Sequence, residues 1–524
     1  MLTSSDLQSR LEQLTAIGIA LSAETHIDAL MESILIAAKS LAGADAGSLY
    51  MLRDGMLHFE ILMCDSLGVA LGGTSGKPVF LPAVALHHPD GRSNHNNVVA
   101  CAVLEARTIN IEDAYRAADY DFSGTRQFDQ LTGYRSQSFL TVPLKNHEQE
   151  IIGVLQIINA LDPAGKVVEF SPDNQRLVES LASLAAIALT NRQLIRSLEN
   201  LFEAFINLIN LAIDDKSPYT GRHCQRVPEL TLMLADALDR SSEGSLSSFS
   251  MSEKDRYELK IAAMLHDCGK ITTPVHVVDK ATKLHTLFDR ISQIETRLEV
   301  MRRDAEIACL RGEIREDELA ARKAQLDDDG TFLRRVNRGG EAMADEDVLR
   351  VQQLACQTWL DAAGQRQPLL SADEVENLTI RKGTLTQAER NIINHHIEVT
   401  IQMLEALPWP KHLRRVPEFA GGHHERMDGK GYPRGLTREQ MSVCARIMGI
   451  ADVFEALTAS DRPYKLGMKL SQAMTILARM ARDQHIDSDL FAVFVREGVW
   501  LDYARRFLHP EQLDQVDVES LLRL

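Results

Sequence analysis

Residues 171–215 have the sequence SPDNQRLVESLASLAAIALTNRQLIRSLENLFEAFINLINLAIDD, and this stretch separates two regions of different character. Ser171 can cap a helix and Pro172 suits a first helical position, so a helix is predicted to begin here. A seam of apolar residues, interrupted only by Asn191, then recurs in alternating steps of four and three: Leu177, Leu181, Leu184, Ala188, Asn191, Ile195, Leu198, Phe202, Phe205, Ile209 and Ala212. This heptad repeat favours a long helix that pairs in parallel with a copy of itself, and a helix packed within one chain is the alternative.

The region before this helix combines a helical pattern with short β-type runs. Residues 26–43 show helical periodicity. Five runs rich in β-branched and aromatic residues follow, at 47–52, 57–64, 107–111, 138–145 and 150–160. The last two are separated by the polar residues 146–149, which predicts a hairpin. Residues 1–170 are therefore expected to form an α/β (α+β) domain.

The region after the long helix is predicted to be helical almost throughout. Between residues 284 and 380 lies a block dense in charges, which contains LFDRISQIETRLEVMRRDAEIACL at 287–310. Its helical periodicity indicates a solvated helical hairpin inserted between two parts of the domain, with no side chains that suggest chemistry. The predicted divisions are therefore residues 1–170, the linker helix at 171–214, and residues 215–524 with this insertion.

The composition limits the partners of the chain. Its 524 residues carry a formal net charge of -17 at pH 7, which opposes general binding to nucleic acid polymers or anionic membranes. A phosphate-bearing substrate would therefore have to meet a local cation, such as a bound metal. No secretory signal pattern and no bilayer-length apolar stretch are found, so a cytoplasmic protein is expected. Seven cysteines without a C-x-x-C pair indicate reduced thiols in that compartment.

Histidines gather in the C-terminal region, where nine of the 17 lie between His223 and His424. A single histidine is usually a core or surface residue, but several imidazoles together with carboxylates suit divalent transition metals. The candidates are His223 in YTGRHCQRV, His266 and Asp267 in AAMLHDCGK, His395 and His396 in NIINHHIEVT, His423 and His424 in AGGHHERMDGKGYP, and Asp452 in RIMGIADVFEAL. Adjacent histidines can reach one ion only near a helix end, and the glycines downstream of His424 allow that backbone turn.

The chain from about residue 212 to its end resembles the HD-GYP family, a branch of the HD metal-dependent phosphohydrolases. Four motifs in the same order carry the resemblance: YTGRH..RV, HDCGK, HHERMDGKGYP and ARIMGIADVFEALTASDRPYK. It implies an all-helical domain that hydrolyses cyclic di-GMP, a bacterial second messenger, to pGpG or on to GMP. It also implies that the GYP loop docks partner proteins, including cyclic di-GMP synthases. The charged block at 284–380 is not part of the usual pattern.

The resemblance further implies two divalent metal ions, with Fe or Mn favoured and Ni or Zn left open. One ion would be held by His223, His266, Asp267 and Asp452, and the other by Asp267, His396, His423 and His424. Asp267 would then bridge the two ions, while His395 would have no part in the site. Some relatives hold a third ion through a glutamate where this chain has Tyr219, which favours two ions here. Such a pair lowers the pKa of a bound water, so that hydroxide can attack a phosphodiester at neutral pH.

Four further side chains are expected near the substrate. Lys270 is predicted to act with Asp267 in catalysis by orienting or neutralising the scissile phosphate, and a plain surface lysine is the alternative. Arg462 and Lys465 in RPYK are predicted to clamp the phosphates of the substrate, and solvent-facing side chains are the alternative. Tyr432 is predicted to contact the substrate as part of the loop wall, which Asp428, Gly431 and Pro433 help to shape.

The N-terminal region resembles a GAF domain, with GYRSQSFLTVPLKNHEQEIIGVLQIINA at 133–160 as the stretch that matches best. GAF domains bind small molecules, often cyclic nucleotides, or serve only in dimerisation. In a cyclic-nucleotide signature a lysine is expected after the asparagine of QIINALD, and this chain has Ala160 there. The resemblance therefore implies an unknown small molecule and names no ligand.

These expectations combine into a GAF-regulated cyclic di-GMP phosphodiesterase that forms a homodimer through the linker helix. One alternative keeps the chemistry and changes the substrate to 3′,3′-cyclic GMP-AMP, because guanine contacts have no clear signature in the sequence. The other alternative is a non-catalytic receptor or scaffold that binds cyclic di-GMP. The complete set of metal-ligand candidates favours an enzyme.

Overall fold

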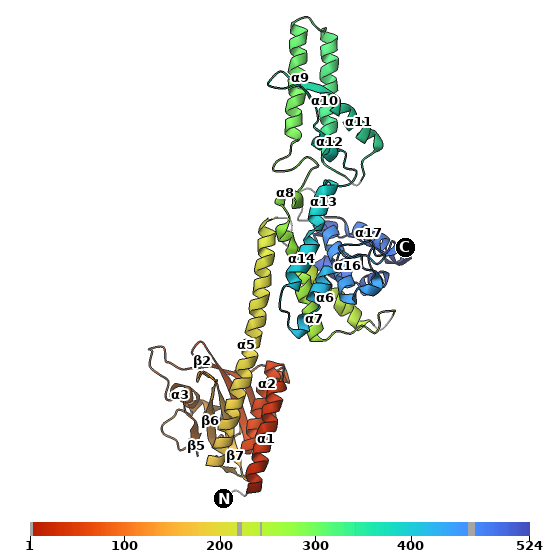
Figure 1. Cartoon of the computed structure of the whole chain (residues 1–524). Coiled ribbons are helices and arrows are strands. Elements are labelled where there is room, and N and C mark those ends of the chain that lie inside the picture. The colour runs from red at the N-terminus through yellow and green to blue at the C-terminus, as the bar shows by residue number, and fades with distance from the viewer. Residues whose placement is uncertain (1–3, 217–222, 242–243, 341, 460–466, 524) are drawn as a thin grey trace. The chain divides into compact units, whose positions relative to one another are not determined.

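The computed structural model describes residues 4–216, 223–241, 244–340, 342–459 and 467–523 (Figure 1). The chain folds into two compact units, residues 1–201 and 202–524, and the boundary falls within helix α5 (Pro172–Lys216). Among the described residues, no helix combines the length and the apolar composition that crossing a membrane requires.

The first unit is built on an antiparallel sheet with the strand order β3-β2-β1-β7-β6-β5. Its strands are β1 (Ala44–Arg53), β2 (Met56–Cys64), β3 (Val69–Gly72), β5 (Ile109–Ile111), β6 (Phe139–Lys145) and β7 (Ile151–Leu161), while β4 (Val84–Ala85) pairs with β2 and β8 (Val167–Val168) with β7. All five predicted runs form strands, and β6 and β7 form the predicted hairpin, in which Val142 pairs with Leu155. The sequence did not predict β3, β4 and β8, because two to four residues are too few to show a period of two.

Helices cover both faces of this sheet. On one face, α1 (Ser4–Ala23), α2 (Ile27–Ala42) and the first part of α5 lie side by side and share a core with the strands (Figure 1). On the other face, α3 (Val98–Leu104) forms a second core with strand residues such as Tyr50 and Val154. Helix α4 (Ser123–Thr132) comes before β6, and the short 3-10 turn η1 (Gly73–Ser75) follows β3. This unit is the predicted α/β domain.

Helix α5 begins where the sequence predicts, because Ser171 Oγ accepts a hydrogen bond from the backbone N–H of Asn174 at 3.1 Å. The predicted seam is partly wrong, since Leu181 lies in the core of the first unit and Phe202 and Ile209 pack against the core of the second. The large apolar side chains of α5 that are exposed are Leu184, Ile187, Leu194, Ile195, Leu198, Leu201, Phe205, Leu208 and Leu211. Most of these nine residues again recur in steps of three and four. Every second position of this repeat lies one residue before the position that the predicted seam gives it. We call this set the exposed apolar stripe of α5.

The second unit is helical, and its core gathers helices from both sides of the inserted block. The helices are α6 (His223–Arg240), α7 (Glu253–Leu265), α14 (His396–Glu405), α15 (Val416–Gly421), α16 (Val443–Thr458), α17 (Leu470–Arg482), α18 (Ser488–Arg496), α19 (Val499–Phe507) and α20 (Val518–Arg523). Four 3-10 turns connect them: η2 (Cys268–Thr272), η3 (Lys411–Leu413), η4 (Arg438–Gln440) and η5 (Pro510–Gln512).

The block between residues 284 and 380 has a core of its own, with buried residues from Leu284 to Leu378. Its helices α9 (Ile291–Leu310) and α10 (Glu316–Asn337) form the predicted hairpin, and α11 (Asp345–Ala355) and α12 (Ala372–Leu378) pack beside them (Figure 1). The prediction of an all-helical block is wrong in one respect, because β9 (Thr358–Leu360) and β10 (Arg366–Pro368) form a small sheet. Three-residue strands carry no usable periodicity. Helices α8 (Val275–Val278) and α13 (Gln387–Asn394) flank the block.

Candidate metal centre

Five segments of the second unit bring the seven predicted metal ligands together. His223 begins α6, His266 and Asp267 follow the end of α7, and His396 begins α14. His423 and His424 follow the end of α15, and Asp452 lies in the middle of α16. Six of the seven side chains therefore stand at helix ends, where the backbone can turn neighbouring side chains toward one point. His395 is exposed and hydrogen-bonds Glu398 instead, as expected for the histidine that was left out.

The first ligand cluster consists of His223, His266, Asp267 and Asp452. His223 Nε2 lies 3.3 Å from Asp267 Oδ2 and 3.2 Å from Asp452 Oδ1. His266 Nε2 lies 3.3 Å from the same Asp267 oxygen and 3.8 Å from the same Asp452 oxygen. The two imidazoles and two carboxylates thus face a single point, and their mixture of nitrogen and oxygen atoms suits a divalent transition metal.

The second ligand cluster consists of His396, His423 and His424, which lie beside the other oxygen of Asp267. His396 Nε2 lies 3.3 Å from Asp267 Oδ1 and 3.2 Å from His424 Nε2. One nitrogen from each of the three histidines can be chosen so that all lie within 4.8 Å of one another. Because its two oxygens face different clusters, the Asp267 carboxylate is positioned to join them.

Three of the histidine rings are held by their Nδ1 atoms, which leaves their Nε2 atoms directed to the centre. Nδ1 of His266 donates to the carbonyl of Ala263 at 2.8 Å, and Nδ1 of His423 donates to the carbonyl of Ala420 at 2.6 Å. His396 makes the same contact with the carbonyl three residues before it, at 2.5 Å. A carbonyl can only accept, so these contacts require Nδ1 to carry the proton and leave Nε2 as a ligand atom.

Two buried atoms of this centre have no hydrogen-bond partner among the described residues: Asp267 Oδ1 and His423 Nε2. His396 Nε2 lies close to Asp267 Oδ1, but the contact does not have the geometry of a hydrogen bond. Buried polar atoms are normally paired, because leaving one unpaired costs about 1–3 kcal/mol. A bound cation would pair both atoms, so the residues present fit a metal ion at the second cluster, while the first cluster fits one by its mixture of nitrogen and oxygen ligands.

The charges of the two clusters differ. Burial lowers the pKa of His424 to about 4 and that of His423 well below the usual range, so both imidazoles are neutral. Burial opposes ionisation of Asp267, but Lys270 and His266 outweigh it and hold the pKa of Asp267 well below its usual value. Burial also opposes protonation of His266, but Asp267 and Asp452 raise its pKa to about 9. Burial likewise opposes protonation of His223, but Asp267, Asp452 and Glu455 raise its pKa well above the usual value. A divalent ion requires ionised carboxylates beside neutral imidazoles, so a metal at the first cluster would displace the protons of His223 and His266.

The sequence interpretation missed Glu455, which holds the first cluster from behind. Its carboxylate accepts hydrogen bonds from His223 Nδ1 and, at 2.6 Å, from Arg226 Nε. Glu455 is 1% exposed, and both partners hold its pKa below the usual value although burial opposes this. A signal was available, because Glu455 follows Asp452 by three residues and so lies on the same face of α16.

A close approach between η2 and α14 brings Asp267 beside His396. Gly269 N–H donates to Thr400 Oγ1 at 2.9 Å. A Cβ atom at Gly269 would lie 2.0 Å from the carbonyl oxygen of His396 and 2.6 Å from Thr400 N. Only glycine therefore fits at this position of the HDCGK motif.

Two of the predicted substrate contacts lie at the centre. Lys270 Nζ lies 2.5 Å from Asp267 Oδ2, so the lysine is paired with the carboxylate expected to bridge the ions. The Tyr432 ring stacks on His424 with 4.9 Å between ring centroids, and burial raises the pKa of Tyr432 to about 12. Arg462, Lys465 and Tyr219 lie outside the described residues.

Glu425 fixes the loop that carries Tyr432, and the sequence interpretation also missed this residue. Its buried carboxylate accepts backbone hydrogen bonds from Arg434 at 2.7 Å and from Leu436 at 2.9 Å. A Cβ atom at Gly431 would lie 2.4 Å from Arg426 N, so the loop requires a glycine there. Asp428 shapes the loop as predicted, because its Oδ1 accepts from Lys430 N at 3.1 Å.

A further group with metal-ligand atoms lies in the first unit, where His95, Cys101 and Glu105 come together. Glu105 is already hydrogen-bonded to Arg107 Nε at 2.5 Å. The adjacent guanidinium opposes binding of a second cation, so this group is less suited to a metal ion than the centre of the second unit.

Comparison with known proteins assigns both units. Residues 26–189 match the profile of the GAF domain, and residues 220–329 and 370–490 match two profiles of the HD domain. A 3′3′-cGAMP-specific phosphodiesterase of Vibrio cholerae is 39% identical over 126 residues, which are 24% of this chain and 28% of that protein. A cyclic di-GMP phosphodiesterase of Pseudomonas aeruginosa is 37% identical over 116 residues, 22% of this chain and 27% of that protein. The matched part therefore spans little more than a quarter of each relative. A solved GAF domain from an Acinetobacter phosphoenolpyruvate-protein phosphotransferase is 14% identical with a TM-score of 0.27, covering 36% of this chain and 98% of that one.

Proposed function

Because the chain consists of a GAF domain followed by an HD domain, we propose that it is a metal-dependent phosphodiesterase that hydrolyses cyclic di-GMP to pGpG or GMP. The observation that carries this proposal is the position of the Asp267 carboxylate. Its two oxygens face two separate histidine clusters, and one of these oxygens, Oδ1, is buried without a hydrogen bond. The phosphodiesterase names of the relatives support the same reaction class.

In this proposal the first ion is held by His223, His266, Asp267 and Asp452, and the second by Asp267, His396, His423 and His424. Fe and Mn are the metals we favour for both ions. When bound, two such ions supply a water of lowered pKa and neutralise negative charge on a phosphate. No protein nucleophile is then required.

The side chains of the chain itself position the reaction. The Nδ1 contacts of the histidines hold the ligand atoms in place before any ion binds, which lowers the reorganisation that binding requires. Lys270 contributes a positive charge beside Asp267, where a phosphate oxygen could take the place of the carboxylate as its partner. Tyr432 covers His424 and forms a wall against which a planar base can stack.

The test is turnover of cyclic di-GMP by purified protein of known metal content. The Asp267→Ala variant should lose activity by more than about 100-fold and bind less metal, since changes even behind the ligands cost about 10–100-fold. Asp304→Ala, which alters an exposed aspartate of α9, is the matched control. Full activity of Asp267→Ala would contradict the bridging role, and tight binding of cyclic di-GMP without metal or turnover would support a receptor instead.

The substrate 3′,3′-cyclic GMP-AMP is the second candidate, because the Vibrio cholerae relative named for that substrate shares 39% identity. Parallel progress curves with both cyclic dinucleotides distinguish the candidates. A higher kcat/KM for 3′,3′-cyclic GMP-AMP would replace cyclic di-GMP as the substrate and leave the metal chemistry unchanged.

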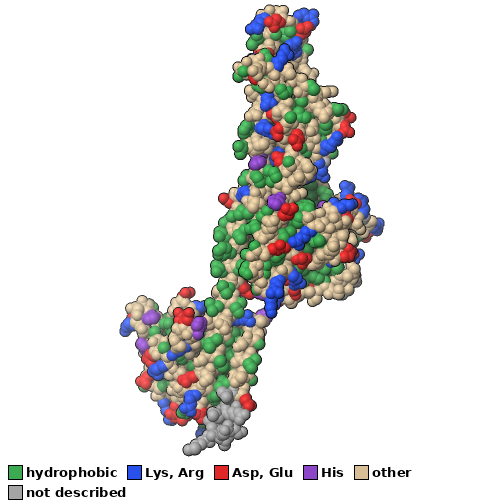
Figure 2. Space-filling model, viewed as in Figure 1, with side chains coloured by type: hydrophobic (Ala, Val, Ile, Leu, Met, Phe, Trp, Pro, Cys, Tyr) green, Lys and Arg blue, Asp and Glu red, His purple; other side chains and the backbone are tan. Residues whose placement is uncertain are grey.

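The proposal includes a homodimer formed through the exposed apolar stripe of α5. Figure 2 shows hydrophobic side chains gathered along this helix. Leu194, Leu198, Leu201, Phe205 and Leu208 are each more than half exposed and follow each other in steps of four and three, the spacing that a two-stranded coiled coil buries. A dimer at micromolar concentration in sedimentation is expected, and a monomer would contradict it.

A further inference from the structure

The GAF domain contains a cavity of about 440 Å³ that no part of the proposed reaction uses. Strands β1, β2, β6 and β7 form one wall, and residues of α3 and α4 form the other. The volume lies in the range of cavities that hold small organic ligands.

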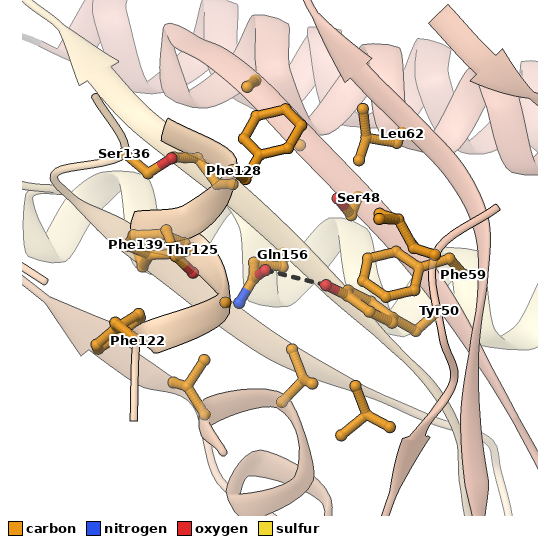
Figure 3. A pocket seen from close by; sticks show the side chains of 18 of the residues that line it. Ser48, Tyr50, Phe59, Leu62, Phe122, Thr125, Phe128, Ser136, Phe139 and Gln156 are labelled. Carbon is orange, nitrogen blue, oxygen red and sulfur yellow. Dashed lines mark hydrogen bonds between the residues drawn. The ribbon is translucent and has the colours of Figure 1, made fainter. Parts of the chain in front are cut away.

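Two aromatic pairs line this cavity. The Tyr50 and Phe59 rings have centroids 4.3 Å apart, and the Phe122 and Phe139 rings have centroids 5.2 Å apart. Figure 3 shows the side chain of Gln156 between the two pairs. Flat rings on two sides of a polar group favour a planar ligand, which can contact both pairs at once.

Gln156 is a buried carboxamide with unused hydrogen-bonding capacity. Its Oε1 accepts from the hydroxyl of Tyr50 at 3.2 Å, and its Nε2 donates to Thr141 Oγ1 at 3.0 Å (Figure 3 shows the first contact). A carboxamide offers two N–H groups and two acceptor positions, so these contacts leave one of each. Both remaining positions belong to the same flat group, which suits a ligand with adjacent N–H and C=O groups.

The charges of the cavity oppose an anion. Among the described residues that line it, none is Lys, Arg or His, and Asp121 is the one charged residue. Two helices begin at the cavity, but Asn97 Oδ1 accepts from the backbone N–H groups of Val99 and Ala100, and Asp121 Oδ1 accepts from that of Ser123. Asn97 thus occupies N–H groups at the start of α3, and at the start of α4 the phosphate of a nucleotide would face the carboxylate of Asp121.

The same distribution of charged residues around the cavity opposes a buried cation. Aromatic rings attract cations, but a charge taken out of water also requires an ionised partner or strong hydrogen bonds. The one carboxylate, Asp121, is exposed and is occupied by Ser123 N–H at 2.8 Å. The polar group between the rings is the neutral amide of Gln156.

We propose that this cavity binds an uncharged, planar heteroaromatic molecule that carries a carboxamide or lactam edge and pairs that edge with Gln156. The two aromatic pairs enclose the ring of the ligand, and the amide of Gln156 both donates to it and accepts from it. The proposal assigns a class of ligand that lacks a phosphate, and it is independent of the reaction proposed for the HD domain.

Three probes of the same shape test the charge preference of the full-length protein: quinoline-3-carboxamide, quinoline-3-carboxylate and N-methylquinolinium-3-carboxamide. Binding is measured by ligand-observed NMR and titration. The neutral carboxamide should bind about tenfold or more tightly than the carboxylate, which is the discrimination that one two-point amide pairing supplies. It should also bind more tightly than the quinolinium, whose buried charge would have no ionised partner. Preferred binding of the carboxylate or of the quinolinium, or no binding of any probe at millimolar concentration, would overturn the proposal.

Two variants test whether the carboxamide probe binds in this cavity rather than at the HD domain. Gln156→Leu should weaken the carboxamide by about tenfold or more, while Gln130→Leu on the exposed side of α4 should have no effect. Gly124→Phe is the second variant, because Gly124 lines the cavity and a Cβ atom there would meet nothing within 4 Å. It should block the probe without lowering the melting temperature. Unchanged affinity in Gly124→Phe and in folded Gln156→Leu would overturn the assignment to this cavity.

Discussion

The contact behind the first metal ligand gives the sharpest test of how the centre is organised. Glu455→Gln keeps the size of the side chain, removes its negative charge and replaces one of its two acceptor oxygens with an NH2 group. In the structure that charge lies against His223 Nδ1 and 2.6 Å from Arg226 Nε, in surroundings that leave Glu455 1% exposed. The variant therefore removes the charge behind the imidazole that faces the first ligand cluster and keeps one acceptor oxygen for it.

The expected loss follows from the position of Glu455 behind a ligand. A carboxylate that accepts from the far nitrogen of a histidine makes the near nitrogen a stronger ligand, and its loss costs about 10–100-fold in metal affinity. This range corresponds to about 1.4–2.8 kcal/mol. The glutamine can still accept from His223, so the lower end of about tenfold is expected. A change to alanine would instead remove both acceptors and most of the side chain, and so would confuse loss of charge with loss of packing.

The assay is competition between the protein and a chromophoric chelator for Mn²⁺ or Zn²⁺, with thermal unfolding of the metal-free protein as a separate measurement. Glu405→Gln is the matched control, because it removes the same charge from an exposed pair with Arg434 at the end of α14. The control should keep the affinity of the wild type. Equal metal affinity of Glu455→Gln and wild type would refute the reasoning, and so would a loss of affinity of the same size in the control.

Gly269→Ala should lower the metal content and the melting temperature, because its Cβ would lie 2.0 Å from the carbonyl oxygen of His396. The control Gly340→Ala, where a Cβ meets nothing within 4 Å, should change neither quantity. Full metal content in Gly269→Ala would contradict the prediction. Asp487→Asn should cost about 3 kcal/mol of stability at neutral pH, since it breaks a buried pairing with two arginines. Burial opposes ionisation of Asp487, but these arginines lower its pKa, so the charge stabilises the fold above the unfolded pKa. The cost measured by urea unfolding should therefore shrink below about pH 4, and an equal cost at both pH values would argue against this cause. Leu198→Asp should convert the proposed dimer to a monomer in sedimentation, because Leu198 is 64% exposed on α5, and a persisting dimer would exclude this face.

The sequence was sufficient where a pattern extends over many residues. The five runs that form strands and the start of α5 at Pro172 were predicted because side-chain periodicity and a capping residue act locally. The strands β9 and β10 were missed because three residues show no period. The seam of α5 was displaced because Ile187 and Ala188 are both apolar, and only packing decides which of them is buried.

The side chains that are available to hold a metal can be identified from the sequence alone, because imidazoles and carboxylates in four recognisable motifs are a chemical property of the chain. The arrangement in which the two oxygens of Asp267 face different clusters arises in the folded chain, since this arrangement depends on the close approach of Gly269 to α14. The role of Glu455 arises from folding as well, because its contact with His223 joins residues more than 200 positions apart. Such contacts cannot be predicted from local sequence, because they arise from the packing of helices that are distant along the chain.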